Sequence, residues 1–417
     1  MERRDTHVRE HARRPVRSAG WWVVVASVSA VALAACSSPR PPAPPGSATP
    51  YVLGATVDLS GPLAAYGRGF EAAWNGYFDA VDALGGIDGH RVQLDILDDA
   101  SVPARQVANM RTLLARKVLL VSGITVSDTC ALLAPSLSAA HVPELCTTIP
   151  ATLAVAPPPY VFSMSDPETM LVKAVDHVIE TKVHASSVRV ATVLPDVAGL
   201  TDMGDALAAD AAARGWNTVA SQVVALSSLS DVAAQAAAVL RAHPDAVVSD
   251  IAETGAVPLV RDLRAGGFTG PVVFGNADYP TLATLQDPGV FQVWTAQVAD
   301  PDSTAPAVRA LVSALGTQGV SGVASVNALD IPVEYLGAAL AAKALAACQA
   351  PCTARGVDQA LANTEVNLSE LSAGQYGFQP GRNVPVADVD VYAWNPAAAE
   401  PRPWATDLPA VQPFPLS

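Results

Sequence analysis

The feature that most constrains this sequence is a long alternation of short apolar segments with amphipathic ones. The apolar segments, which predict strands, lie at residues 51–58, 91–97, 118–123, 142–146, 188–194, 219–224, 246–249, 272–274 and 388–394. Between them, apolar side chains recur at helical spacing, as at Phe70, Trp74 and Phe78. Short apolar strands alternating with amphipathic helices are typical of parallel sheets covered on both faces. A break near residue 165 divides the pattern into two α/β lobes.

Composition agrees with a folded protein of more than one domain. Half of the 417 residues are hydrophobic and 15% are charged, so a sizeable core can form and global disorder is excluded. At roughly 150 residues per domain, this length corresponds to two or three domains. Acidic residues outnumber basic ones by 39 to 25, and the formal net charge is -14. Because such a surface repels phosphate backbones, we expect no nucleic-acid partner.

The N-terminus indicates export. Residues 1–20 carry six arginines, and the next fifteen residues, Trp21 to Ala35, carry no charge. That run is shorter than the roughly 20 apolar residues of a membrane span, and it suits a secretory signal. It ends in Leu33-Ala34-Ala35-Cys36, which resembles the lipobox of bacterial lipoproteins. The resemblance implies cleavage before Cys36 and lipidation of its thiol; an ordinary signal peptide with an incidental cysteine is the alternative.

We therefore expect residues 1–35 to be a lipoprotein signal peptide and residues 36–50 to be a proline-rich tether. Six prolines occur among residues 37–50, and proline favours extended polyproline II chain. The expected location is outside the cytoplasm, with the protein anchored to the outer face of the cell membrane by a lipidated Cys36. The sequence leaves the export route, Sec or twin-arginine, open.

Outside the cytoplasm, the four remaining cysteines suggest two disulfides. Four cysteines allow three pairings, of which we favour Cys130–Cys146 and Cys348–Cys352. Cys130 lies in the first turn of a predicted helix and Cys146 ends the following strand, two points that a right-handed βαβ unit brings close. Cys348 and Cys352 flank Pro351 at a predicted helix end. Free buried thiols are the alternative.

Open parallel sheets bind ligands beyond the carboxyl ends of their strands, so the candidate ligand residues lie there. Ser127 opens a predicted helix, where a hydroxyl and unpaired backbone N–H groups suit an anion, although the residue could only cap the helix. Glu253 and Asp278 follow strands of the second lobe, where a carboxylate suits a ligand amine and a solvated loop acid is the alternative. Asp98 and Asp99 end the second strand, and such pairs more often cap the next turn than contact a ligand.

Four segments, in this order along the chain, resemble one family. They are GATVDLSGPLAAYGRGFEAAWNGYFDAVDALGGIDGHRVQLDILDD (54–99), KVLLVSGITVSDTCALLAPSLSAAHVPELCTT (117–148), YVFSMSDPE (160–168) and QYGFQPGRNVPVADVDVYAWN (375–395). Over nearly all of residues 51–400, the sequence resembles the branched-chain amino-acid-type substrate-binding proteins of ABC transporters. The resemblance implies the type 1 periplasmic-binding fold, an α/β fold with two doubly wound parallel-sheet lobes joined by a three-strand hinge. A ligand cleft would lie between the lobes.

The same resemblance implies how the chain is divided. Residues 51–164 and 295–386 would form lobe 1, and residues 165–294 and 387–417 would form lobe 2. The segment at 160–168 would be the first crossing between them. Trp294 lies near the second crossing, and we expect it in the core rather than at a ligand.

Individual residues match the family unevenly. Tyr66 matches a tyrosine that lines the family's cleft, and Ser127 matches the serine that binds the ligand carboxylate. Thr148 lies where a backbone carbonyl holds the ligand ammonium. Asp278 matches the acid that pairs with the ammonium after a one-residue slip, and Glu253 aligns near a second aromatic position. These five residues are the expected ligand-binding set.

Two positions depart from the family pattern. Pro150 stands where the family offers a threonine hydroxyl, and proline has neither a hydroxyl nor an N–H group. Ala198 stands where the second lobe presents a tyrosine. The first lobe therefore matches better than the second, and specificity for leucine does not carry over.

Motifs for other activities are weak. Residues 67–72 match the dinucleotide pattern GxGxxA, but about nine residues separate them from the preceding strand, whereas a true fingerprint turns directly into its helix. The sequence contains no GxSxG elbow, no metal-ligand spacing and no carboxylate pair that suits acid–base work. We expect no catalysis, no cofactor and no metal.

The expected function is capture of a small polar ligand, an amino acid or a related amide or carboxylate, by hinge closure. The partners would be the permease and ATPase subunits of an ABC transporter, together with the membrane through the lipid anchor. Two alternatives stay open, because one fold hosts many functions. They are a ligand sensor for a membrane signalling partner and an exported α/β enzyme.

Overall fold

The computed structural model describes most of the chain after residue 47. The described residues are 48–123, 127–251, 253–275, 279–294, 296, 303–328, 330–368, 371–372, 376–385 and 388–409. The predicted signal peptide, Cys36 and nearly all of the predicted tether lie outside them. By its contacts the chain divides into two units, Met1–Pro42 and Ala43–Ser417, and the fold described below is that of the second unit. Among the described helices, none is long and apolar enough to cross a membrane.

A five-stranded parallel sheet forms the centre of the first lobe. In spatial order, β2-β1-β3-β4-β5, its strands are Val92–Asp98, Tyr51–Val57, Val121–Ser122, Glu144–Cys146 and Val161–Ser163. All four pairings are parallel. Along β1, Leu53, Ala55 and Val57 enter one hydrophobic cluster while Val52 packs against the other, which is the two-residue period of a strand buried on both sides.

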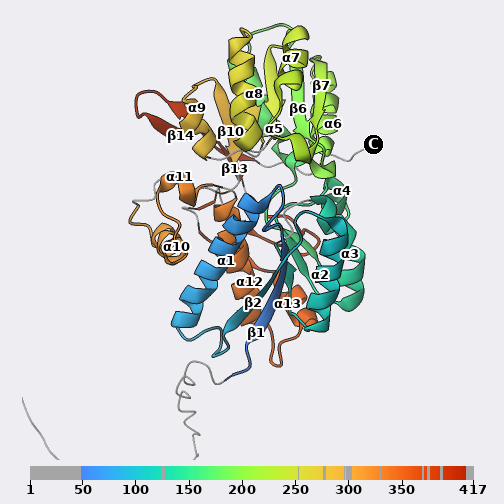
Figure 1. Cartoon of the computed structure of the whole chain (residues 1–417), viewed down its shortest axis with the longest axis vertical. Helices are drawn as coiled ribbons and strands as arrows, with labels where there is room; N and C mark the ends of the chain where they lie inside the picture. The colour runs from blue at the N-terminus through green and yellow to red at the C-terminus, as the bar shows by residue number, and fades with distance from the viewer. Residues whose placement is uncertain are drawn as a thin grey trace, which may run out of the picture. The chain divides into compact units, whose positions relative to one another are not determined.

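Helices cover both faces of this sheet. One face carries α1 (Ala64–Ala83), α10 (Pro306–Thr317) and α12 (Ile331–Ala347), and the other carries α2 (Pro103–Ala115) and α3 (Ser127–Ala140). Figure 1 shows α1 and α12 side by side although they lie far apart in the sequence. Because α12 is apolar nearly all round, it is buried along almost its whole length.

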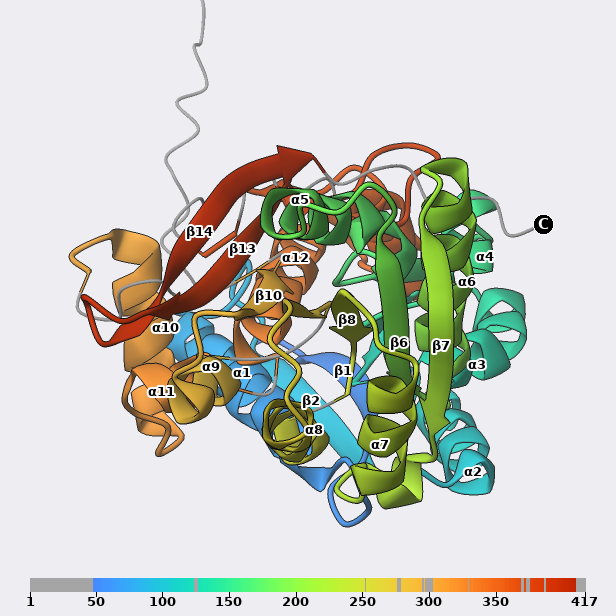
Figure 2. The same cartoon turned by 90° about the horizontal axis from the view of Figure 1, so that it is seen from above.

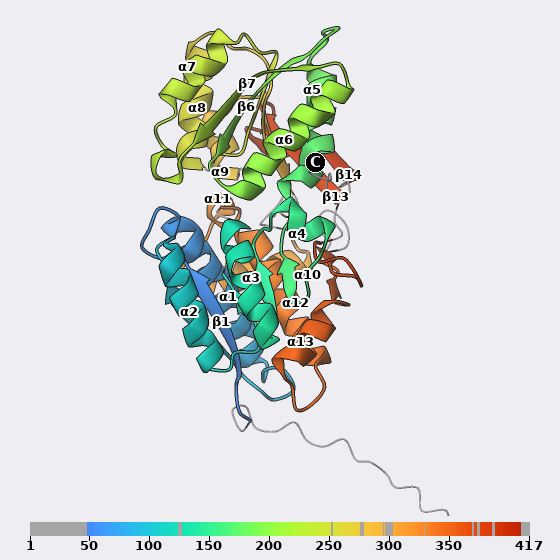
Figure 3. The same ribbon diagram turned by 90° about the vertical axis from the view of Figure 1, so that its right-hand side faces the viewer.

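A seven-stranded sheet forms the centre of the second lobe. In spatial order, β14-β13-β10-β9-β8-β6-β7, its strands are Glu400–Pro409, Asp388–Asn395, Val290–Trp294, Val272–Phe274, Ala246–Ser249, Arg189–Pro195 and Asn217–Val224. One face carries α5 (Val172–Lys182) and α6 (Ala198–Ala213). The opposite face carries α7 (Ala233–Arg241), α8 (Glu253–Ala265) and α9 (Tyr279–Leu285), as Figure 3 shows.

The predicted α/β fold class is confirmed, with one addition. The strands β6 to β10 are parallel to one another, but β13 runs antiparallel to β10, and β14 runs antiparallel to β13. The second sheet is therefore mixed rather than wholly parallel, and the long β13–β14 pair forms one of its edges (Figure 2). Trp294 lies in the core of this lobe as predicted, with its ring centroid 4.5 Å from that of Tyr392.

Short elements complete the fold. They are α4 (Ala151–Val155), α11 (Val323–Val326), α13 (Ala354–Leu361), the 3-10 helices η1 (Glu168–Leu171) and η2 (Leu226–Ser228), and the small pair β11 (Glu365–Val366) and β12 (Tyr376–Gly377). In α13, Thr353 caps the helix by accepting a hydrogen bond from the N–H of Gly356.

The chain passes between the lobes three times. It leaves the first sheet after β5, returns after β10 to build α10 and α12 on that sheet, and crosses again before β13. Residues 295, 386 and 387, which bound the predicted lobes, lie outside the described residues, so the exact division stays a prediction.

Both predicted disulfides are present. Cys130 in α3 is bonded to Cys146 at the end of β4, with their Cα atoms 6.2 Å apart. Cys348 and Cys352, which follow α12, are bonded with Cα atoms 5.4 Å apart. The first bridge ties the start of a helix to the end of the next strand, as the βαβ argument predicts.

Candidate functional site

The two consecutive threonines that follow β4 are held on several sides. The Thr147 hydroxyl donates to Oε1 of Glu334 at 2.7 Å, and the Thr147 carbonyl accepts from the Ser165 N–H at 2.9 Å and the Ser165 hydroxyl at 2.5 Å. The Thr148 hydroxyl donates to Oε1 of Glu168 at 3.3 Å. This turn, at the carboxyl end of the first sheet, is therefore fixed by α12 and by the first crossing segment.

Glu334 is the one acid of α12, a helix that is apolar nearly all round, and it is only 1% exposed. Its Oε2 accepts a hydrogen bond from Trp74 Nε1 at 3.1 Å, so one carboxyl joins α1, α12 and the turn after β4. Burial raises the pKa of Glu334 to about 8, and the charge of Asp330 adds to the rise, while the hydrogen bonds from Thr147 and Trp74 oppose it. The carboxyl is therefore protonated at neutral pH for most of the time.

Glu168 begins η1, directly after Pro167, and it is 4% exposed. Its Oε1 accepts the Thr148 hydrogen bond, and no group of the described residues donates to its Oε2. Burial is the main cause that raises the pKa of Glu168 to about 7; hydrogen bonds from its own backbone N–H and from Thr148 oppose the rise, and the charges of Asp330 and Asp202 add to it. The Glu168 carboxyl is therefore partly protonated near neutral pH.

Asp166 lies two residues earlier in the same crossing segment and is 2% exposed. Neither of its carboxylate oxygens has a hydrogen-bond partner within the described part of the chain. Burial raises the pKa of Asp166 to about 8, with Arg382 lowering it and Glu168 raising it. The crossing segment thus carries two buried acids within three residues.

The two acids at the end of β2, Asp98 and Asp99, accept hydrogen bonds from the loops beside them. Asp98 accepts hydrogen bonds from the N–H groups of Leu59 and Ala100 and from the Ser60 hydroxyl. Asp99 accepts from the Thr56 hydroxyl and the Ser101 N–H. The turn-capping interpretation of this acid pair is therefore confirmed.

Those hydrogen bonds shift the two acids in opposite directions. The Ser60 hydroxyl, followed by the Leu59 N–H, lowers the pKa of Asp98. Burial raises the pKa of Asp99 despite its two hydrogen bonds. Asp58 completes the loop by accepting from Gly61 and Leu63, so the segment that leads into α1 is anchored at both ends.

The structure describes the predicted ligand residues to different extents. Tyr66 lies in the first turns of α1 and is half-buried, and Thr148 lies in the turn that follows β4. Ser127 opens α3 and Glu253 opens α8, but the side chains of both lie outside what the structure describes. Asp278 lies outside the described residues altogether. Their roles as ligand contacts therefore stay predictions.

Sequence reasoning missed Glu168 and Glu334, the two acids that hold the threonine turn. Glu168 belongs to the segment 160–168, whose resemblance to a lobe crossing gave its place but not its role. Glu334 sits in a helix that is apolar all round, where a lone acid is itself a signal, because an unpaired charge is rarely buried.

Glu144 lies beside the disulfide in the other core layer of the first lobe. Its carboxylate and the sulfurs of Cys130 and Cys146 lie within 4.8 Å of one another, and all three residues are buried. Because the two sulfurs are bonded to each other, they offer no thiolate to a metal. Burial raises the pKa of Glu144 well above its usual range, which agrees with a neutral carboxyl in this apolar layer.

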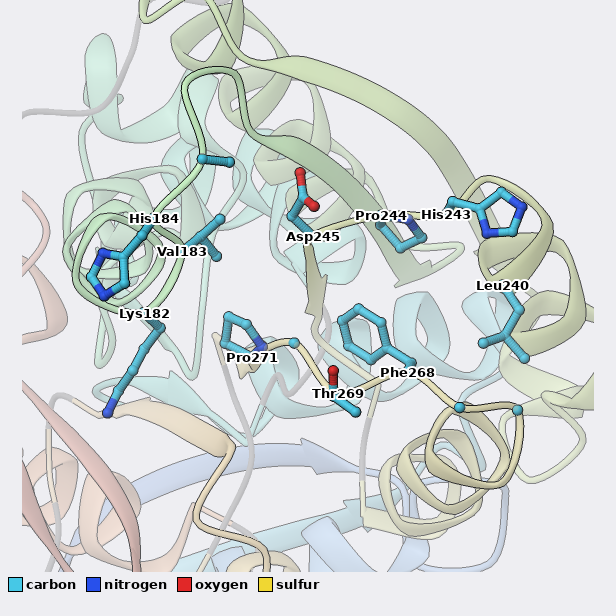
Figure 4. Close-up of a pocket in the computed structure, with 14 residues that line it drawn as sticks. Lys182, Val183, His184, Leu240, His243, Pro244, Asp245, Phe268, Thr269 and Pro271 are labelled. Atoms are coloured by element: carbon cyan, nitrogen blue, oxygen red, sulfur yellow. The ribbon is translucent and has the colours of Figure 1, made fainter.

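A surface hollow of about 600 Å³ lies at the opposite end of the second sheet. Asp245 and Pro271, which line it, directly precede β8 and β9, so it opens at the amino ends of those strands. Figure 4 shows Lys182 and His184 on one side and His243 on the other. Open parallel sheets bind ligands at the carboxyl ends of their strands, so this hollow is not the candidate site.

A family model described as periplasmic binding protein matches residues 50–400 of the chain. The chain belongs to the periplasmic binding protein family. The described topology, with two α/β lobes and three crossings, is the type 1 form of that fold. A search among curated proteins finds no match.

Solved structures of this periplasmic binding protein fold superpose over most of the chain. A branched-chain amino-acid ABC transporter protein from Thermus thermophilus with bound valine has a TM-score of 0.75 at 15% identity, covering 88% of this chain and 97% of its own. A solute-binding protein from R. palustris in complex with 4-hydroxybenzoate has a TM-score of 0.73 at 17% identity, covering 88% and 98%. A fatty acid ABC transporter substrate-binding protein from Thermomonospora curvata has a TM-score of 0.75 at 16% identity, covering 88% and 94%. At these identities the likeness shows the fold alone.

Proposed function

We propose that this periplasmic binding protein captures a small polar ligand between its lobes and delivers it to an ABC permease. The observation that carries the proposal is the family match over residues 50–400 together with the two lobes and their three crossings. Three crossing segments allow the lobes to move about a hinge, and a ligand that both lobes contact stabilises the closed arrangement. The protein binds its ligand without changing it chemically.

The ligand site we propose lies at the carboxyl ends of the two sheets. Ser127, with the N–H groups at the start of α3, would bind a ligand carboxylate, because a helix N-terminus and a hydroxyl both favour an anion. Thr148 would offer its backbone carbonyl, and Tyr66 its ring. Glu253 or Asp278 would approach from the second lobe on closure.

We also propose that the protein works outside the cytoplasm on a lipid anchor. Cleavage before Cys36 would leave residues 36–50 as a tether between the membrane and β1. The two disulfides agree with an oxidising compartment. A protein tethered in this way stays close to the permease that it serves.

A thermal-shift screen tests the proposal, with amino acids, amides, 4-hydroxybenzoate and a fatty acid as probes. We expect at least one probe to raise the unfolding temperature, because a ligand that binds only the folded state stabilises it. Calorimetry then compares the wild type with Ser127→Ala. If Ser127 binds a charged carboxylate, its loss costs about 1.5–3 kcal/mol, which is about tenfold to a hundredfold in affinity.

The matched control is Ser136→Ala, because Ser136 is an exposed serine further along the same helix. This variant should keep the wild-type affinity. Equal affinities for all three proteins would remove Ser127 from the site. A folded protein that no probe stabilises would contradict the proposed function.

A further inference from the structure

We propose that the ligand carries a protonated amine and that Glu168 receives it beside Thr148. The inference rests on the proposed function and names the substrate class of that site. It assigns the cation to an acid of the first crossing segment rather than to the second-lobe acids Glu253 and Asp278. It also favours a ligand that carries an ammonium group, as valine does, over a simple carboxylate such as 4-hydroxybenzoate or a fatty acid.

The two oxygens of Glu168 are used unequally. Oε1 accepts the hydroxyl of Thr148, which fixes the carboxyl on the threonine turn that closes β4. Oε2 accepts no hydrogen bond from any described residue, although Glu168 is only 4% exposed. A buried acceptor without a donor is costly, so this oxygen is suited to a donor that arrives with the ligand.

The neighbouring charges are negative. Asp330, before α12, and Asp202, on α6, both act on Glu168 as like charges, and Asp166 is a third acid in the same crossing segment. Arg382 is the base that acts on Asp166. A ligand that offers only a carboxylate would be repelled by the charges of Asp330 and Asp202, whereas an ammonium group would be attracted by them.

Thr148 gives the ligand a route to this acid. It is partly exposed, as is Ser165 on the crossing segment, while Glu168 lies directly behind the threonine hydroxyl. Thr147 is fixed from two sides by Glu334 and Ser165, so the turn holds Thr148 in place against the buried Glu168 carboxyl. A ligand amine can therefore meet the Thr148 carbonyl and the Glu168 carboxyl together once the lobes are apart.

The protonation of Glu168 gives the binding step a distinct signature. Burial and like charges raise its pKa to about 7, so without ligand the carboxyl is partly protonated near neutral pH. A cation binds only the carboxylate and stabilises it, so binding lowers the pKa and releases a proton to the solvent. The charge-assisted hydrogen bond that forms is stronger than one between neutral groups.

Calorimetry with matched probes tests the inference. The panel pairs several amino acids with the α-hydroxy acids of the same side chain, and adds putrescine, 4-hydroxybenzoate and a fatty acid. We expect an ammonium-bearing probe to bind at least about tenfold more tightly than its hydroxy counterpart, which removes the charge but keeps the shape. Titration in buffers of different ionisation enthalpy should show proton release, and the affinity should rise between about pH 6 and about pH 8.

Glu168→Gln is the decisive variant, because glutamine keeps an acceptor for Thr148 but carries no charge. It should lose the preference for the amine, the proton release and the pH dependence, while thermal unfolding confirms that it folds. Asp205→Asn is the control, since it removes an exposed acid from the same helix as Asp202. This control should keep all three properties.

Two outcomes would overturn the inference. One is tight binding of 4-hydroxybenzoate or the fatty acid with no amine preferred, which leaves the proposed function intact. The other is an amine bound equally well by the wild type and Glu168→Gln, at every pH. If no probe binds the folded protein, the proposed function fails and this inference fails with it.

Discussion

Thr147 donates its hydroxyl to Glu334 at 2.7 Å across 187 residues of sequence. The bond joins the end of β4 to α12, two elements that belong to different passages of the chain through the first lobe. Trp74 donates to the second oxygen of the same carboxyl, so α1 joins the same interaction. A single acid thereby fixes the strand end next to the proposed ligand site.

Replacing Glu334 by a residue that does not titrate should change how stability depends on pH. A carboxyl whose pKa is raised from 4.5 to about 8 by burial binds its proton more tightly in the folded state. Its contribution to stability is therefore complete below the unfolded pKa and is lost as the pH rises through about 8, at about 1.4 kcal/mol per pH unit in between. We expect Glu334→Gln to flatten the fall in the free energy of unfolding, because glutamine can accept from Trp74 and donate to Thr147.

Urea unfolding at a series of pH values measures this slope. Glu71→Gln is the matched control, because Glu71 is a partly exposed glutamate on α1. This control should follow the wild-type profile. A Glu334→Gln slope as steep as that of the wild type would show that another buried acid, such as Asp166, dominates the titration.

Arg214 should matter more to stability than an arginine in a more exposed ion pair. It donates to Asp176 at 2.8 Å, to Asp210 at 2.5 Å and to Glu180, and so joins α5 to α6. Asp176 is only 3% exposed, and removing Arg214 leaves its charge compensated by Lys173 at the longer distance of 3.4 Å. We expect Arg214→Met to lower the free energy of unfolding by about 3 kcal/mol.

Arg116 provides the contrast. Its pairing with Asp95 is 3.3 Å long and 47% of its side chain is exposed, so Arg116→Met should cost less than about 1 kcal/mol in the same urea experiment. Similar losses for the two variants would mean that Arg214 contributes through its exposed contacts rather than through Asp176.

The sequence predicts the alternating elements well because each needs only a local pattern. β1 is a run of apolar residues, and its lobe follows from the order of strands and helices. The strand β14 escapes such reasoning, since Pro401, Pro403 and Pro409 lie within it and proline removes a backbone donor. The sheet tolerates these prolines because β14 is an edge strand, a fact that only the assembled sheet reveals.

The candidate site was predictable only in part for a related reason. Ser127 and Thr148 follow strands, so topology places both at one edge of the first sheet. The contact between Thr148 and Glu168 depends on how the crossing segment folds back. The contact between Thr147 and Glu334 depends on how α12 packs against the first sheet. A sequence pattern usually assigns acids to the surface; the apolar surroundings of Glu334 are a signal of burial, whereas Glu168 lacks such a signal.

The two disulfides should contribute unequally to stability. The Cys130–Cys146 bridge closes a loop with a sequence separation of 16, and the Cys348–Cys352 bridge one of 4. In the chain-entropy picture these loops correspond to about 3 and about 2 kcal/mol. Double alanine variants of each pair, compared by urea unfolding, should differ in that order. A larger loss for the Cys348 and Cys352 pair would contradict the prediction.

Cys36 should carry a lipid. The uncharged run that ends in Leu33-Ala34-Ala35-Cys36 predicts cleavage and acylation at this residue. Metabolic labelling with a fatty-acid analogue should mark the wild type in the membrane fraction and leave Cys36→Ala unlabelled. Cys348→Ala is the control for a cysteine that should not be acylated. Labelling and membrane retention of Cys36→Ala would refute the anchor.

Gly67 should not tolerate even one added carbon. A Cβ atom there would lie 1.9 Å from the backbone carbonyl oxygen of Asp58, because α1 approaches the end of β1 so closely. The close approach accounts for Gly67 without any nucleotide. We expect Gly67→Ala to lower the free energy of unfolding by about 1–3 kcal/mol, since the helix or the loop must shift.

Gly316→Ala is the matched control, because a Cβ atom at that helical position meets nothing within 4 Å. Alanine there should be neutral or should stabilise the helix by up to about 1 kcal/mol. Thermal unfolding of the two variants separates steric crowding from helix propensity. Because Tyr66 adjoins Gly67 at the proposed site, Gly67→Ala should also weaken ligand binding, whereas Gly316→Ala should not. A Gly67→Ala protein as stable as the wild type would show that α1 can move away from Asp58 at no cost.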